Sequence, residues 1–97
     1  MLNLEQEEVK MNARVVFQTS DKRTVGKNIE IPSIPPVGTR LSLKIKDDLD
    51  SIVTVEITQV AWCERDNSLN IRANLCRTSF LTATHLAYDK SWTIIKT

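Results

Sequence analysis

Three side chains with soft metal-ligating atoms raise the first question about the chemistry of this chain. Cys63 and Cys76 are its only thiols, and His85 is the sole histidine among 97 residues. Such residues bind zinc when three or four of them converge on one point. If the chain turns near residues 64–67, the two cysteines lie at opposite ends of a hairpin, about eight residues or roughly 27 Å apart along a strand. We therefore expect no disulfide, no zinc site and no other metal centre.

His85 is also the one side chain whose ordinary pKa suits a general base near neutral pH. Catalysis additionally requires a nucleophile and a group that stabilises developing charge, and the local sequence marks neither. Two glycines are too few to build a phosphate-binding loop or a dinucleotide fingerprint. We interpret His85 as a partly exposed helix residue, and we expect a protein that is not an enzyme and holds no cofactor.

Basic side chains recur on the polar faces of two expected strands. Arg40, Lys44 and Lys46 alternate with apolar residues in one strand, and Arg72 and Asn74 do so in the other. Such a face can follow a phosphate backbone, because Arg and Lys release counterions and Asn adds polar contacts. It has no aromatic platform for base stacking, and the alternative is a solvated face that confers solubility.

The two tryptophans, Trp62 and Trp92, stand near the ends of expected strands. A tryptophan exposed at a barrel rim anchors partners, whereas a buried one fills volume, and the alternation favours burial for most aromatic residues here. The candidate binding residues are Arg40, Lys44, Arg72, Asn74 and Trp62.

Strands must position these residues, because apolar and polar side chains alternate over most of the chain. The alternation predicts five strands, at residues 13–19, 25–31, 39–46, 52–62 and 69–75. In the fourth, the apolar phase slips near Thr58 and Gln59, and a β-bulge there would return Val60 and Trp62 to the core side. A last short strand or apolar flap is predicted at residues 91–96.

All three prolines and one of the two glycines lie in "IPSIPPVG", residues 31–38. Proline cannot donate a ladder hydrogen bond, so Pro32 ends the second strand and the segment crosses stiffly between two hairpins. Gly38 permits the positive φ of a tight entry into the next strand. Near the end of the chain, Ser79 can cap a helix of two to three turns, because apolar residues follow it at helical spacing.

Five or six strands, tight turns and one late helix predict a mainly β fold. We expect a small antiparallel barrel of the Src-homology-like or oligonucleotide-binding type, with a sandwich as the alternative. Closing the barrel would remove exposed sheet edges. The single domain should cover residues 11–97, after an acidic flexible leader at residues 1–10.

Three segments, "VGTRLSLKIKDD", "IVTVEITQVAW" and "LNIRANL", resemble the central strands of PilZ domains, which bind cyclic di-GMP on a small barrel. The resemblance covers less than half of the chain. The family's binding signature is an Arg-rich segment ahead of the barrel and a motif of Asp or Asn, Ser and Gly on early strands. Here "KNIEIPSIPP" occupies the place of that motif without matching it, so no nucleotide-binding residue is carried over.

Composition points to an ordinary globular domain, with 41% apolar and 26% charged residues. A net charge of +1 gives no strong attraction to nucleic acid. No run of about 18 apolar residues could span a bilayer, and "MLNLEQEEVK" does not resemble a signal peptide. With only two cysteines, we expect reduced thiols, a cytoplasmic location and no contact with membranes.

The leading hypothesis is therefore a non-enzymatic binding or assembly module. It would associate with a protein partner or with itself, through an unclosed edge or the C-terminal helix and flap. The second hypothesis is nucleic-acid binding through Arg40, Lys44 and Arg72, and the third is a degenerate PilZ-like nucleotide-binding barrel.

Overall fold

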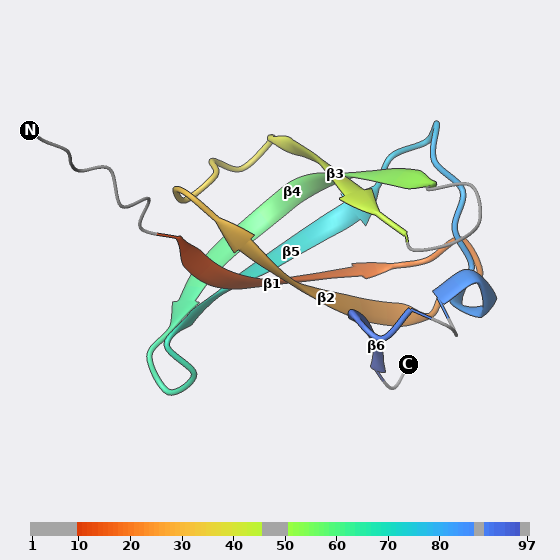
Figure 1. Ribbon diagram of the computed structural model, residues 1–97. Coiled ribbons are helices and arrows are strands. Elements are labelled where there is room, and N and C mark those ends of the chain that lie inside the picture. The colour runs from red at the N-terminus through yellow and green to blue at the C-terminus, as the bar shows by residue number, and fades with distance from the viewer. Residues whose placement is uncertain (1–9, 46–50, 87–88, 96–97) are drawn as a thin grey trace, which may run out of the picture.

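The computed structural model describes residues 10–45, 51–86 and 89–95, apart from the side chain of His85. Six strands form one curled sheet with the shape of a half-barrel (Figure 1). The elements in chain order are β1 (Met11–Gln18), β2 (Thr24–Ile31), β3 (Arg40–Lys44), β4 (Ile52–Cys63), β5 (Ser68–Leu75), the 3₁₀ turn η1 (Ala83–Leu86) and β6 (Trp92–Ile95). Across the sheet, the strand order is β3-β4-β5-β1-β2-β6.

This sheet confirms a mainly β fold, but the predicted closed antiparallel barrel is wrong in two respects. The central pair, β1 and β5, is parallel, while the other neighbouring pairs are antiparallel. The sheet is also open, because its end strands β3 and β6 do not pair with each other. Closure requires the two end strands to pair along their length. Here β6 pairs only with Thr24–Lys27 of β2, and β3 pairs only with Ile52–Glu56 of β4, so no ladder joins the two end strands.

The core lies on the inner face of the curl, where the alternation predicted it. Val15, Val55 and Ile71 have no exposed surface, whereas their neighbours along each strand are more exposed. Ile71 of β5 stands between Val15 of β1 and Val60 of β4, so one apolar row crosses three strands. Burying such a side chain stabilises the fold by about 1.5 to 3 kcal/mol.

The bulge predicted in the fourth strand is confirmed. The register of β4 against β5 shifts between Ile57 and Gln59, so that Val60 lies opposite Ile71 and Trp62 opposite Leu69. Directly opposed residues share a face of the sheet, and both partners on β5 are buried. The extra residue therefore returns Val60 and Trp62 to the core side, as the phase slip indicated.

The proline-rich connector between β2 and β3 behaves as predicted at its end. Gly38 has a φ of 95°, a conformation that side chains bearing a Cβ rarely adopt. Its amide donates to the carbonyl of Ile57 at 2.8 Å, and the amide of Ile57 donates to the carbonyl of Thr39 at 2.9 Å. The end of the connector is thus hydrogen-bonded to Ile57 of β4, next to the bulge, and the chain then continues into β3.

The helix of two to three turns predicted after Ser79 is wrong, since the described residues that follow Ser79 form only the single 3₁₀ turn η1. The Ser79 hydroxyl accepts the amide of Thr54 at 2.9 Å and so does not cap a helix. Leu81 pairs with the β1–β2 turn, where the amide of Ser20 donates to its carbonyl at 2.7 Å and its own amide donates to the Ser20 hydroxyl at 3.1 Å. Leu81 is buried while Phe80 is 72% exposed, so extended pairing overrides the helical spacing of apolar residues.

Two remaining predictions concern the ends and the surroundings of the domain. The acidic leader falls outside the described residues, apart from Lys10. Within the described ranges, no helix is long and apolar enough to cross a membrane.

Candidate functional site

The sequence-predicted binding residues divide between the two faces of the sheet. Arg40 and Lys44 on β3 and Arg72 and Asn74 on β5 are exposed and alternate with core residues, so they lie on the outer face. Trp62 instead shares the inner face with Leu69. The structure therefore groups four of the five candidates on one surface.

That outer surface is not a continuous basic strip. Arg40 lies 3.7 Å from Glu56, measured from Nε to Oε1, on the neighbouring strand. Arg40, Glu56 and Asn74 line one shallow hollow of about 310 Å³. Lys44 stands opposite Ile52, which is 64% exposed. A carboxylate and an apolar side chain therefore interrupt the face that the sequence suggested for a phosphate backbone.

Arg72 has a basic neighbour that the sequence analysis did not place beside it. Arg14 of β1 and Arg72 of β5 line a hollow of about 410 Å³, together with Gln59 and Asn70. Arg14 lies between the buried residues Ala13 and Val15 of β1, and so on the outer face. Its approach to Arg72 depends on the parallel pairing of β1 with β5, and no pattern within either strand signals that pairing.

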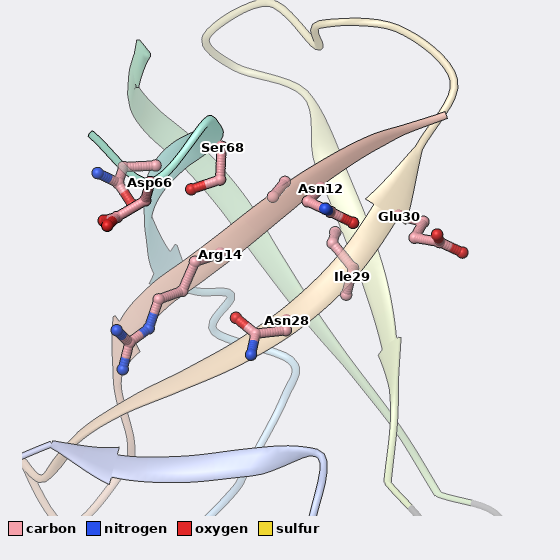
Figure 2. A pocket seen from close by; sticks show the side chains of 9 residues that line it. Asn12, Arg14, Asn28, Ile29, Glu30, Asp66 and Ser68 are labelled. Carbon is pink, nitrogen blue, oxygen red and sulfur yellow. The ribbon is translucent and has the colours of Figure 1, made fainter. Parts of the chain in front are cut away.

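A hollow of about 660 Å³ on the outer face adjoins this pair (Figure 2). Its side chains come from β1, β2, the turn between β4 and β5 and the start of β5, and Figure 2 shows Arg14 and Asn28 side by side on neighbouring strands. The lining residues are Asn12, Ala13, Arg14, Asn28, Ile29, Glu30, Asp66, Ser68 and Asn70. One arginine, two carboxylates and three amides give a surface suited to many hydrogen bonds with a polar partner.

A second unusual feature is Lys27, which lies on the inner face of β2 although it is charged. Its Nζ donates to the carbonyl of Lys44 at the end of β3, at 2.7 Å, and to the hydroxyl of Ser91 at 3.2 Å. It also lies 4.9 Å from the ring centroid of Trp92. One ammonium group thus connects β2 with β3 across the opening of the half-barrel.

The Lys27 ammonium belongs to a short polar chain at the start of β6. The hydroxyl of Ser91 donates to Oδ1 of buried Asp89 at 2.7 Å, and the amide of Ser91 donates to the same oxygen at 3.0 Å. Burial lowers the pKa of Lys27 below its ordinary value of 10.5, and the charge of Asp89 opposes this effect. No sequence pattern signals this arrangement, because Lys27 occupies an alternation position that predicts an apolar residue.

The lowered pKa of Lys27 predicts a pH dependence of stability. The unfolded chain holds more protons than the folded chain between the lowered pKa and 10.5, so the contribution of Lys27 to stability should rise with pH across that window. Replacing Lys27 with methionine should remove this rise. Urea unfolding of both proteins from neutral pH to pH 10.5 measures it, with Lys44→Met as the control; parallel curves for the wild type and Lys27→Met would contradict the prediction.

The two cysteines lie where the hairpin argument put them. Cys63 ends β4 opposite Ser68, Cys76 follows the far end of β5, and both are free. In the part of the chain that the structure describes, no group of three or more His, Cys, Asp or Glu could hold a metal ion. The interpretation of the His85 side chain falls outside the described residues.

Comparisons of the chain with known protein families, with curated proteins and with solved structures find no match. The resemblance of its central strands to PilZ domains therefore rests on the strand pattern alone.

Proposed function

We propose that this domain is a non-enzymatic binding and assembly module, which joins a protein partner or a second copy of itself through open edges of its sheet. The observation that carries the proposal is the half-barrel. Because β3 and β6 end the sheet without pairing with each other, each leaves backbone donors and acceptors along one side. Such edges bind additional strands with main-chain hydrogen bonds, and closed barrels have none to offer.

Sedimentation velocity over a wide range of protein concentration tests the proposal. We expect a sedimentation coefficient that rises with concentration, or a complex with a protein from extract that survives purification. Edge pairing depends on backbone hydrogen bonds and apolar contacts, so moderate salt should leave it intact. A chain that stays monomeric at the highest concentration, and that forms no complex in extract, would count against this function.

One observation favours a second candidate, binding of single-stranded nucleic acid. The hollow shared by Arg14 and Arg72 has no carboxylate among its lining residues. Two arginines there could contact phosphates, and such a complex would weaken steeply with salt. The same samples distinguish the candidates, since unchanged mobility of a labelled oligonucleotide at low salt excludes this one.

A further inference from the structure

The described edges of the sheet differ in how well they are protected against pairing with another chain. The edge of β3 is five residues long and carries Arg40 and Lys44 at its two ends. The uncovered part of β2 contains Glu30 and runs into Pro32, and β6 has only four residues. Charges, proline and short length are the usual means by which proteins block edge pairing. The part of β4 after the bulge, Thr58–Cys63, has no charged residue and no proline, and it is longer than β3 or β6.

This segment, which we call the β4 edge, pairs with β5 on one side only. On its other side, the connector stops at the bulge, where Ile57 exchanges hydrogen bonds with Gly38 and Thr39. Pairing with β3 ends even earlier, at Glu56. Beyond Ile57, no described segment other than β5 is hydrogen-bonded to the backbone of the β4 edge.

The β4 edge also exposes apolar side chains that belong to the inner face. Trp62 lies opposite buried Leu69 and yet is 51% exposed. Val60 lies opposite Ile71 and is only partly buried. A neighbouring strand would cover both residues, because β3 performs this task only along the first part of β4. An uncovered tryptophan beside unpaired backbone is a strong combination for binding a strand.

We propose that a second copy of this chain occupies the β4 edge, an inference that rests on the proposed assembly function. The two edges run antiparallel around a two-fold axis at Ala61, which places Val60 of each copy opposite Trp62 of the other. In this register both pairs stay on the inner face, so each Trp62 is covered. Thr58 lies opposite Glu64, and no like charges meet.

The β4 edge is self-complementary, which favours a second copy over an unrelated peptide: Val60 and Trp62 stand two residues apart on the same face, so two-fold pairing covers both. The β4 edge has no charged residue, and the chain has a net charge of only +1, so two copies approach without appreciable repulsion. A charged peptide would gain nothing from this edge beyond its backbone bonds. The two-fold pairing also uses one edge of each copy, which gives a closed dimer and avoids open-ended growth.

Disulfide trapping tests the register in the full-length chain. Ala61→Cys, with Cys63→Ser and Cys76→Ser, puts two thiols on the two-fold axis. Opposed Cβ atoms there lie about 4.5 to 5.5 Å apart, near the distance that a disulfide spans. We expect a covalent dimer under mild oxidation. The matched control is Ser42→Cys in the same background, at the centre of the exposed β3 edge.

The outcomes separate this inference from the proposed function. Cross-linking of Ala61→Cys but not of Ser42→Cys supports the β4 edge. The opposite result overturns it while leaving self-association intact. A protein that stays monomeric at every concentration, with neither variant cross-linking, overturns pairing with a second copy; a complex with a foreign protein would then still support the broader function.

A second variant keeps the inference testable without oxidation. Trp62→Lys places a charge against Val60 of the partner, and it should fold because Trp62 is half exposed. We expect dimerisation to weaken by roughly tenfold or more, equivalent to about 1.4 kcal/mol. Ile34→Lys, at an apolar residue of similar exposure on the connector, is the control and should leave dimerisation unchanged. Equal dimerisation of the two variants would overturn the inference.

Discussion

Ile71→Ala is expected to lower the free energy of unfolding by about 3 kcal/mol. Ile71 has no exposed surface and stands in the row between Val15 and Val60, where β5 joins its two neighbours. The resulting cavity should stay open, because β5 and its neighbour β1 are each fixed by ladders on both sides. Urea unfolding followed by circular dichroism measures the loss.

The control for Ile71→Ala is Asn70→Ala, one residue earlier on the same strand and facing outward. Exposed substitutions of this kind usually change stability by less than about 0.5 kcal/mol. Similar small losses for both variants would show that the inner face of β5 is not the centre of the core.

Trp92→Ala is expected to cost about 4 kcal/mol, the largest effect among single substitutions on the C-terminal strand. Trp92 is 6% exposed, and its ring meets Phe17 edge to face, with centroids 5.7 Å apart and planes at 81°. The Nζ of Lys27 lies over the Trp92 ring, 4.9 Å from its centroid. Because β6 pairs with β2 over only four residues, removing this anchor should release the strand. Urea unfolding measures the cost, and hydrogen exchange of the β2 amides reports the release.

Two companion variants sharpen the Trp92 prediction. Ile94→Ala alters the same strand at a residue that is 47% exposed, and it should cost much less. Trp92→Phe keeps a ring but removes Nε1, a buried atom with no hydrogen-bond partner in the described structure. An unsatisfied buried donor costs about 1 to 3 kcal/mol, so its removal offsets part of the lost packing. A Trp92→Ala loss no larger than that of Ile94→Ala would refute the anchoring role.

Local patterns predicted the strands well, because each face of a sheet imposes its period on the residues of that strand. The phase slip at Thr58 and Gln59 even located the bulge. The pairing of β1 with β5 could not be predicted from local patterns. It joins strands that are far apart in the sequence, and the residue pattern within each strand does not indicate its partner. The helix after Ser79 failed because a hydrogen bond from the amide of Thr54 and pairing of Leu81 with Ser20 override local spacing.

The candidate surface was predictable to a similar degree. Arg40, Lys44, Arg72 and Asn74 were correctly assigned to a polar face, because alternation alone decides that. Whether a face carries a continuous charge depends on cross-strand neighbours, and Glu56 beside Arg40 became visible only with the register. Likewise, the bulge predicted the side on which Trp62 lies, while its exposure depends on where β3 ends.

The parallel contact between β1 and β5 also bears on how this chain acquires its shape. Each remaining ladder among β1 to β5 joins strands that are consecutive in the sequence, so two antiparallel units, β1–β2 and β3–β4–β5, can assemble early from nearby residues. These two units are joined by the parallel pairing of β1 with β5, which begins with Ala13 opposite Leu69. Pairing between strands so far apart in the sequence is slow. During synthesis, the first hairpin must therefore wait for β5 to leave the ribosome, with the other edge of β1 still unpaired.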